Sequence, residues 1–321
     1  MNKIVVSFWM LALLFAGDIY CQTVIPEKPK VAVTIDDLPL QRLDSFSKEE
    51  TQTIFDKLID QIRKQKIPAI GFVIKSKLMV DGKYDSGRIN LLKNWLNAGF
   101  DLGNHTFSHR SANELPVKEY EEDIVNGDSV LRKVVEESGK ELKYFRHPFL
   151  HTGLSLNVRE QIGSFLKKNG YKVAPVTIDN AEWIFGAAYD KAAKENNSDL
   201  MQRIGTEYIR YMNAKFVYYE GRSKELFGRE ISQVLLIHAN KLNSDYFGEL
   251  CGMIRWRGYN FVNLEEALKD EAYKSKDTFV KNNGISWIDR WAITAGKPKE
   301  FFAGEPRTPA YIMKLAGVDS E

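Results

Sequence analysis

Short apolar runs alternate with longer amphipathic stretches along most of the chain. The apolar runs are rich in β-branched residues and have the length of buried strands, whereas the amphipathic stretches repeat apolar side chains at helical spacing. We expect strands at residues 31–35, 68–74, 100–103, 143–145, 171–178, 234–237 and 260–262. We expect helices at residues 47–65, 86–98, 117–137, 156–168, 191–219, 244–257 and 264–272. This alternation predicts an α/β protein with a parallel sheet.

Five of the predicted strands lead into a polar or charged residue with chemical potential. These residues are Asp36, His105, Arg146, Asp179 and His238. The carboxyl ends of parallel strands meet at one edge of the sheet, and in a barrel that edge carries the active site. An open doubly wound sheet would bind its ligand at a switch point that draws on fewer strands. We therefore favour a barrel-like closure.

The alternation is absent from the N-terminal end of the chain. Lys3 precedes an apolar stretch from Ile4 to about Gly17, which is the pattern of a secretory signal and is too short to span a membrane. We predict a signal peptide at residues 1–21 and export to the periplasm, the cell envelope or the outside. A lipid anchor on Cys21 is the alternative. Cys251 then has no partner for an internal disulfide.

The rest of the chain divides into a domain and an extension. Residues 22–272 carry the alternation and would form one large domain, whereas residues 273–321 do not continue it. We expect Trp287 and Trp291 to pack this C-terminal extension onto the domain.

Charge excludes one class of partner. The chain has 45 Lys and Arg residues against 43 Asp and Glu residues, and the basic residues are scattered among the acidic ones. A nucleic-acid surface needs clustered basic residues, so none is predicted.

Histidine is scarce and is confined to three short segments. The chain has five histidines, and His105 and His109 are spaced so that a helix would carry both imidazoles on one face, where they could share a metal ion. No Glu follows His105, so this is not the H-E-x-x-H motif of metalloproteases. The adjacent carboxylates of Asp36 and Asp37 would repel each other unless a cation lies nearby. The simplest assignment gives Asp37 to the metal and leaves Asp36 as a base.

Five motifs in chain order resemble those of the NodB-homology polysaccharide deacetylases, carbohydrate esterase family 4. They are T-I-D-D at 34–37, H-T-F-S-H at 105–109, R-H-P-F at 146–149, D-N-A-E-W at 179–183 and L-L-I-H at 235–238. The resemblance covers roughly residues 30–268. It implies a distorted (β/α)7–8 barrel of the NodB type and a divalent metal ion, usually Zn²⁺.

The resemblance also implies a role for each catalytic residue. The metal ligands would be Asp37, His105 and His109. Asp36 would be the general base and His238 the general acid. Arg146 would hold the Asp36 carboxylate by a charge-assisted hydrogen bond. Pro148 and Phe149 would lie at the substrate, where the amide of Phe149 or Leu150 could stabilise an oxyanion.

The fourth motif departs from the family pattern. Glu182 stands where the family has the aspartate that orients the catalytic histidine. Either Glu182 reaches this histidine differently, or Asp179 takes over the orienting role. Trp183 matches the hydrophobic wall that the family places against the acetyl group.

Two histidines and one long segment have no duty implied by the resemblance. We expect His147 to face solvent or the groove, and His151 to make a structural hydrogen bond. The 184–233 segment is longer than the family usually shows. We expect its aromatic residues in the core rather than over the groove; they are Tyr208, Tyr211, Phe216, Tyr218 and Tyr219.

Together these features predict an exported, metal-dependent hydrolase that removes N-acetyl groups from an amino-sugar polymer, such as peptidoglycan, chitin oligomers or an exopolysaccharide. The alternatives are an O-acetyl esterase acting on xylan, a hydrolase of a linear or cyclic amide that is not a sugar, and a non-catalytic carbohydrate-binding relic. Intact Asp36, Arg146 and His238 argue against the relic, because a binding module needs neither a base nor an acid.

Overall fold

The computed structural model describes residues 28–321 of the chain. The predicted signal peptide and the alternative anchor at Cys21 lie outside these residues. Within them, none of the helices combines the length and the apolarity that crossing a membrane requires.

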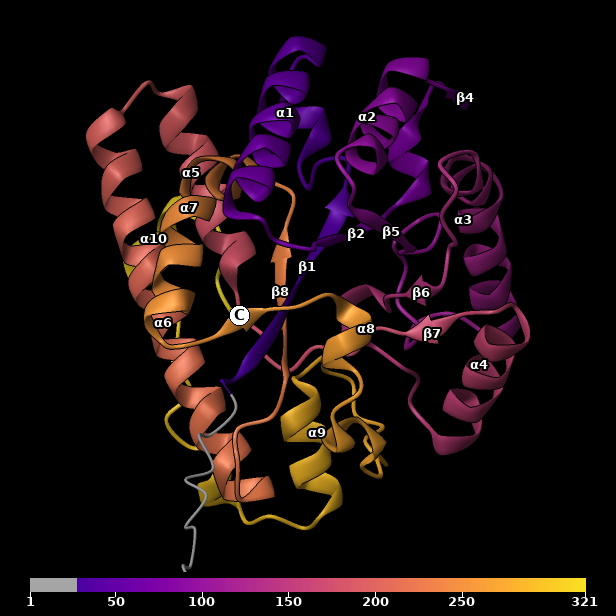
Figure 1. Cartoon of the computed structure of the whole chain (residues 1–321), viewed down its shortest axis with the longest axis vertical. Helices are drawn as coiled ribbons and strands as arrows, with labels where there is room; N and C mark the ends of the chain where they lie inside the picture. Colours follow the sequence, from indigo (N-terminus) through magenta and orange to yellow (C-terminus); the bar gives the residue numbers. More distant parts are fainter. Residues whose placement is uncertain (1–27) are drawn as a thin grey trace, which may run out of the picture.

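One parallel sheet forms the centre of the molecule (Figure 1). The strands run in the order β7-β6-β5-β2-β1-β8, and the short β9 pairs with β1. Their bounds are β1 (Lys30–Leu38), β2 (Ile70–Val73), β5 (Asp101–Asn104), β6 (Tyr144–Phe145), β7 (Lys172–Val173), β8 (Gln233–His238) and β9 (Asn260–Phe261). A separate two-stranded hairpin consists of β3 (Met79–Val80) and β4 (Lys83–Tyr84). The central β1 is buried along almost its whole length, in agreement with its apolar sequence.

The sheet curls until its two outer strands are linked through the segment that follows β7. Ile178 forms a single parallel bridge with Leu235 of β8, and the Ile178 amide donates to the Val234 carbonyl at 3.0 Å. The segment predicted as one strand at 171–178 therefore pairs in two parts. Its first part, β7, pairs with β6, and Ile178 near its end pairs with β8. The fold is a distorted half-barrel of the predicted (β/α) type.

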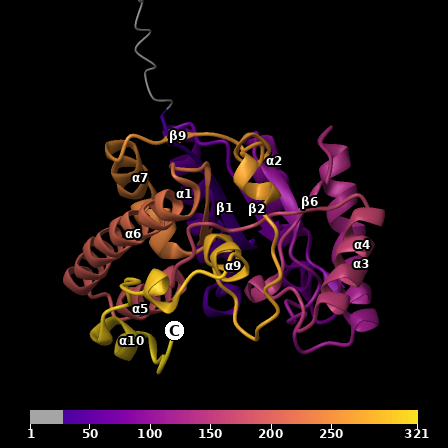
Figure 2. The same ribbon diagram turned by 90° about the horizontal axis from the view of Figure 1, so that it is seen from below.

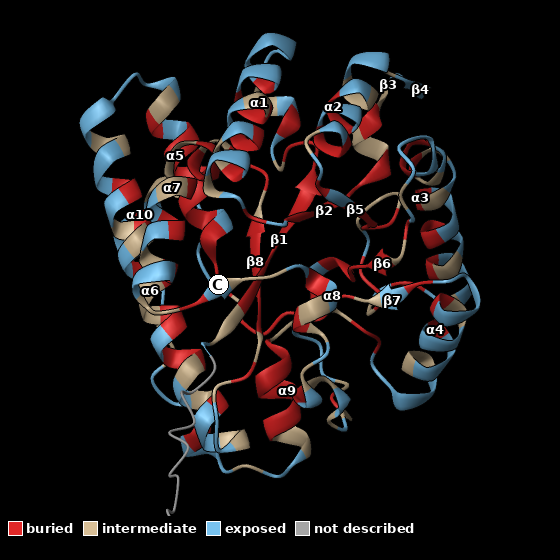
Figure 3. Ribbon diagram, viewed as in Figure 1, coloured by how far each residue is buried: buried red, intermediate tan, exposed pale blue. Residues whose placement is uncertain are grey.

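Helices surround the sheet and turn their buried faces towards it (Figure 3). In Figure 1, α5, α6, α7 and α10 lie on one side of the strands, and α3 and α4 lie on the other. The bounds are α1 (Lys48–Gln65), α2 (Ser86–Asn97), α3 (Val117–Glu137), α4 (Leu156–Lys168), α5 (Glu182–Lys194), α6 (Ser198–Phe227), α7 (Lys241–Trp256), α8 (Leu264–Ala267), α9 (Trp287–Thr294) and α10 (Ala310–Ala316). The predicted cap of α1 is present, because Ser47 and Glu50 form a reciprocal capping box.

The long helix expected at 191–219 is two helices, α5 and α6. Asn196 has a left-handed backbone with φ 51°, and Asn197 then caps α6 through the Leu200 amide. Helix α5 begins at Glu182, earlier than expected. Its buried positions include small residues such as Ala187 and Ala188, which give the sequence no marked apolar period from which to predict this start. The tyrosine-rich face of α6 is buried, as predicted.

The C-terminal residues pack against the domain. Trp287 and Trp291 of α9 are buried, and the Trp291 ring meets the rings of Phe227 and Tyr273 edge to face. Helix α10 contacts α5. The contact between Trp291 and Phe227 packs α9 against the end of α6.

Candidate active site

The carboxyl ends of the parallel strands bring four of the predicted residues to one edge of the sheet. Asp36 and His238 face each other as paired positions of β1 and β8. Asn104 and Phe145 are paired positions of β5 and β6, so His105 and Arg146, which follow them, are also neighbours. This arrangement follows from the parallel topology.

Three predicted metal ligands converge beside this edge. The His105 Nε2 atom lies 3.7 Å from Asp37 Oδ1, and the His109 Nε2 atom lies 3.5 Å from the same oxygen. All three potential ligand atoms lie within 4.8 Å of one another. Asp37 Oδ1 is buried and has no hydrogen-bond partner, which is unfavourable unless another group binds it. A divalent cation fits this set of donors.

The orientation of His105 supports the same interpretation. Its Nδ1 atom lies 2.8 Å from the Arg146 carbonyl oxygen, which can only accept, so Nδ1 carries the hydrogen and Nε2 keeps a free lone pair. Burial lowers the pKa of His105 well below its usual value, and it also lowers the pKa of His109. Burial opposes ionisation of Asp37, but Lys77 and His109 outweigh it and lower the pKa of this carboxyl. All three side chains therefore have the protonation state of metal ligands.

The H-T-F-S-H segment is a loop, not the helix that the spacing of His105 and His109 suggested. Thr106 and His109 have left-handed backbones, with φ 64° and φ 57°. The Asn104 side chain accepts from the Thr106 amide at 2.7 Å, and the Thr106 hydroxyl accepts from the His109 amide at 3.0 Å. Local side-chain bonds of this kind compete with helix formation. The loop brings the two imidazole centroids to 4.7 Å.

Asp36 is a buried carboxylate with one unoccupied oxygen. Its Oδ1 atom has no hydrogen-bond partner, and Oδ2 lies 3.7 Å from His105 Nε2 and 3.9 Å from Arg146 Nε. Burial raises the pKa of Asp36 to about 6, although the nearby Arg146 lowers it. A carboxylate with this pKa can accept a proton near neutral pH.

Arg146 is completely buried but does not make the predicted hydrogen bond to Asp36. Its Nη2 donates to the Thr34 hydroxyl at 2.7 Å, and its guanidinium lies 4.8 Å from the Phe72 ring centroid. These contacts hold the guanidinium at ion-pair distance from Asp36, without a hydrogen bond between the two side chains.

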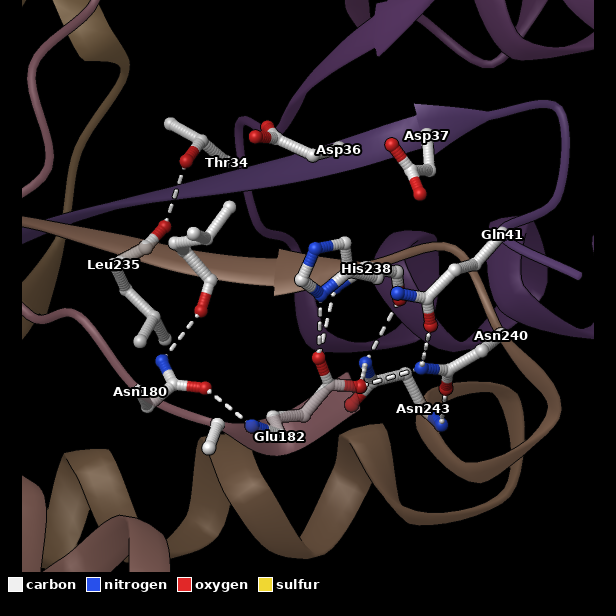
Figure 4. A network of polar contacts seen from close by, with 12 residues as sticks. Thr34, Asp36, Asp37, Gln41, Asn180, Glu182, Leu235, His238, Asn240 and Asn243 are labelled. Carbon is white, nitrogen blue, oxygen red and sulfur yellow. Dashed lines mark hydrogen bonds and ion pairs between the residues drawn. The ribbon is translucent and has the colours of Figure 1, made fainter. Parts of the chain in front are cut away.

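Glu182, not Asp179, orients His238. The His238 Nδ1 atom lies 2.8 Å from Glu182 Oε2, whereas Asp179 accepts from the Asn180 amide. Figure 4 shows the His238 ring between Glu182 and the Asp36–Asp37 pair. Burial opposes the charged imidazole, but the Glu182 hydrogen bond and charge prevail and raise the pKa of His238 to about 9. The Glu182 carboxylate thus favours the protonated imidazole.

Two asparagines that the sequence reasoning missed hold Glu182 in place. The side-chain amides of Asn240 and Asn243 both donate to Glu182 Oε1, the second at 2.7 Å. Asn240 also caps α7 by accepting from the Asn243 amide. Their spacing directly after His238 was the available signal, because a cap at this point fixes both side chains beside the strand end.

Two aromatic residues that adjoin site residues are exposed. Phe149 is 54% exposed, and its ring centroid lies 4.7 Å from that of His109. Trp183, next to Glu182, is 37% exposed. Pro148 is buried. The Leu150 amide already donates to the His147 carbonyl at 3.1 Å, so of the two amides considered for an oxyanion, that of Phe149 is the better candidate.

His147 and His151 have different surroundings. His147 was expected to face solvent or the groove, but it is buried and shares a 3.0 Å hydrogen bond with Tyr120, against which it stacks. Burial lowers the pKa of His147 to about 3, so it is neutral. His151 makes the expected structural hydrogen bond, with Ser111 at 2.8 Å.

Comparison with known proteins agrees with the motifs. A family model described as polysaccharide deacetylase matches residues 23–174. This match includes the first three motifs and ends before Glu182 and His238. The search among curated proteins found no match.

Several solved structures are similar over about three quarters of the chain. A peptidoglycan deacetylase, PdaC from Bacillus subtilis, is 21% identical, with a TM-score of 0.45 over 77% of this chain and 94% of that one. A family 4 acetyl xylan esterase from Clostridium thermocellum is 18% identical, with a TM-score of 0.46 over 74% and 90%. A mutant of BA3943, a family 4 pseudoenzyme from Bacillus anthracis, is 15% identical, with a TM-score of 0.48 over 76% and 68%.

The family model and the ordered motifs point to the same family. The polysaccharide deacetylase model matches residues 23–174 of this chain, in agreement with the resemblance that the first three motifs carry.

Proposed function

We propose that the protein is a metal-dependent hydrolase that removes N-acetyl groups from an amino-sugar polysaccharide or oligosaccharide. The observation that carries this proposal is the pairing of Asp36 and His238 across neighbouring strands, beside the cluster of Asp37, His105 and His109. A base, an acid and a set of metal ligands within one buried edge are the groups that hydrolysis of an unactivated amide requires.

The three-residue cluster would hold a divalent cation, for which Zn²⁺ is the first choice because two imidazoles and one carboxylate suit it. When bound, such an ion polarises the acyl carbonyl and makes water more acidic. Lys77 braces the cluster, since its ammonium donates to the backbone carbonyls of Leu40 and Gln41 and lies 3.6 Å from Asp37 Oδ2.

Asp36 takes a proton from the attacking water. Its free Oδ1 atom can accept this proton, and the charge of Arg146 at 3.9 Å favours the ionised form that begins the reaction. The Phe149 amide supplies a hydrogen-bond donor for the negative oxygen of the tetrahedral intermediate.

His238 donates a proton to the departing amine. Because Glu182 occupies Nδ1, the proton is delivered from Nε2, on the side of the ring that faces the aspartates (Figure 4). An amine anion is a very poor leaving group, so cleavage of an amide depends on this proton more than cleavage of an ester does.

Acetylated glycans are the proposed substrates. Export directed by the predicted signal peptide would bring the enzyme to them. The exposed rings of Phe149, beside His109, and of Trp183, next to Glu182 in the sequence, suit sugar rings and an acetyl group. An O-acetyl esterase activity on xylan, or hydrolysis of an amide that is not a sugar, would use the same residues and is the alternative.

The decisive experiment measures metal content and acetate release by the purified protein. N-acetylglucosamine oligomers and acetylated xylan serve as substrates, Asp36→Asn removes the proposed base, and Asp44→Asn changes a carboxylate that is fully exposed. We expect acetate release from the amino-sugar oligomers by the wild type and Asp44→Asn, and a loss on the order of 10²-fold or more in Asp36→Asn. Metal binding without acetate release from any glycan would favour the non-sugar amide instead.

A further inference from the structure

The loop after β6 has a backbone that its surroundings must hold in place. Phe149 and Leu150 are consecutive residues with φ 56°, a left-handed conformation that is unfavourable for side chains with a Cβ atom. Such a conformation persists only where neighbouring contacts impose it. The conformation matters to the site, because Phe149 contacts the His109 ring.

Arg290 of α9, in the C-terminal segment, supplies one of these contacts. It is completely buried, and its guanidinium donates to the Leu150 carbonyl at 3.4 Å and to the Thr152 hydroxyl at 2.8 Å. Asp277 accepts from Arg290 Nε at 2.9 Å, and Trp287 stacks on the guanidinium at 4.3 Å. The Asp277 carboxylate and the Trp287 ring therefore fix the guanidinium, which holds the loop through Leu150 and Thr152.

Asp277 connects the same loop to the helix that follows it. Arg159 of α4 donates to the Asp277 carboxylate at 2.6 Å and to its backbone carbonyl at 2.7 Å. Asp277 thus connects Arg290, which holds Leu150 and Thr152, to the first turn of α4.

Gly284 makes a second, independent contact with this loop. A Cβ atom at Gly284 would lie only 1.8 Å from the Phe149 carbonyl oxygen, so the two backbones are in direct contact. Only glycine permits this approach without displacing one of the backbones.

The C-terminal segment also reaches two other loops of the site. The Ser286 hydroxyl donates to the Thr177 carbonyl at 2.7 Å, two residues before Asp179. Asn282 accepts from Asn113, four residues after His109, at 3.4 Å. In Figure 2, α9 lies between the α5–α6 side and the α3–α4 side of the molecule. One segment therefore fastens the loops of three motifs.

We propose that residues 277–290 are a positioning element of the active site, in which Arg290 and Gly284 set the conformation of Phe149. The catalytic consequence rests on the proposed function, in which the Phe149 amide stabilises the oxyanion. The structural consequence, a rigid 147–153 loop, does not depend on the reaction.

The first test compares Arg290→Met with Arg257→Met. Arg257 is a partly buried arginine, with a 12% exposed side chain that binds Glu220 and Asn213, and it lies at the opposite end of α7 from His238. Hydrogen–deuterium exchange is measured for peptides that cover residues 147–153, and kcat, KM and Zn²⁺ affinity are measured in parallel.

In Arg290→Met we expect faster exchange in 147–153, a fall in kcat of more than about tenfold, and little change in KM or Zn²⁺ affinity, because an oxyanion donor acts in the transition state. In Arg257→Met we expect none of these changes. Unchanged exchange in Arg290→Met, or an equal fall in kcat in both variants, would overturn the proposal.

The second test compares Gly284→Ala with Gly252→Ala, and it needs no loss of a buried charge. A Cβ atom at Gly252, in α7, would meet nothing within 4 Å. We expect Gly284→Ala to reproduce the faster exchange and lower kcat, and Gly252→Ala to behave as the wild type. Wild-type exchange and kcat in Gly284→Ala would overturn the role of this contact.

The two proposals can fail separately. If the wild type released no acetate from any glycan, the proposed function would be wrong, and exchange in 147–153 would still decide whether the segment positions the loop. If the wild type released acetate and kcat in Arg290→Met equalled that of the wild type, only the positioning proposal would be wrong.

Discussion

Glu182 Oε2 and His238 Nδ1 lie 2.8 Å apart, at the junction between α5 and the end of β8. The Glu182 carboxylate also accepts from the His238 backbone amide at 3.2 Å. The same carboxylate therefore orients the imidazole and raises its pKa to about 9.

Replacing Glu182 by glutamine should move the alkaline limit of activity. His238 donates a proton in the proposed reaction, so activity should fall as pH rises through about 9. In Glu182→Gln the charge that raises this pKa is lost, and the decline in kcat should begin at lower pH. A pH profile of kcat checks this. Glu230→Gln is the control, because Glu230 is a half-buried carboxylate that binds Tyr259 and Gln233 instead. An unchanged alkaline limb in Glu182→Gln would contradict the proposed role of His238.

Metal titration should separate ligands from the general acid. We expect His105→Ala to lose most of its Zn²⁺ affinity, because one of three protein ligands is removed. We expect His238→Ala to bind Zn²⁺ nearly as the wild type does, but to release acetate more slowly on the order of 10²-fold. Competition with a chromophoric chelator measures both affinities. Equal loss of metal in the two variants would show that His238 is itself a ligand.

Gly127 of α3 should be required for the metal-binding loop. A Cβ atom at Gly127 would lie 2.6 Å from Asn104 Oδ1 and 2.8 Å from the Thr106 carbonyl carbon. Gly127→Ala should therefore displace the loop, lower stability by about 1–3 kcal/mol and weaken Zn²⁺ binding. A Cβ atom at Gly163, in α4, would meet nothing within 4 Å. Gly163→Ala should therefore change neither the stability nor the Zn²⁺ binding of the protein. Thermal unfolding with and without Zn²⁺ tests the pair; wild-type affinity in Gly127→Ala would refute the prediction.

Asp289 should make stability depend on pH. Burial raises its pKa from 3.8 to about 7, so the folded protein retains a proton that the unfolded chain has lost. The contribution of Asp289 to the free energy of unfolding should therefore be greatest below about pH 4. It should decline as the pH rises to about 7. Asp289→Asn should be more stable than the wild type at pH 8 and lose that advantage near pH 4. Melting temperatures across this range test the sign, with the exposed Asp319→Asn as control.

The sequence predicted the edge of the sheet where the site lies, because strand alternation and parallel pairing follow from local pattern. Asp36 and His238 meet simply because β1 and β8 are neighbours. The capping box of Ser47 and Glu50 also depends only on neighbouring residues, and it is present as predicted. Features that depend on one strand and its immediate sequence were thus within reach.

Features that depend on residues distant in the sequence could not be predicted from it. His147 is buried because Tyr120, 27 residues away, supplies a ring and a hydroxyl. Whether Glu182 or Asp179 would orient His238 depends on the start of α5 and on the amides of Asn240 and Asn243. The departure of His105–His109 from a helix depends on side-chain bonds within the loop, which a spacing argument does not weigh.

The left-handed residues of the site limit how this protein could be engineered for heat resistance. Among residues 28–321, five of the eight non-glycine residues with positive φ lie in the site loops: Asp37, Thr106, His109, Phe149 and Leu150. Glycine is the usual remedy at such positions and relieves about 1–2 kcal/mol of strain. At Asp37 and His109 it would delete a side chain that the proposed reaction requires. A thermostable variant must therefore keep this strain and find its gains on the outer faces of the helices.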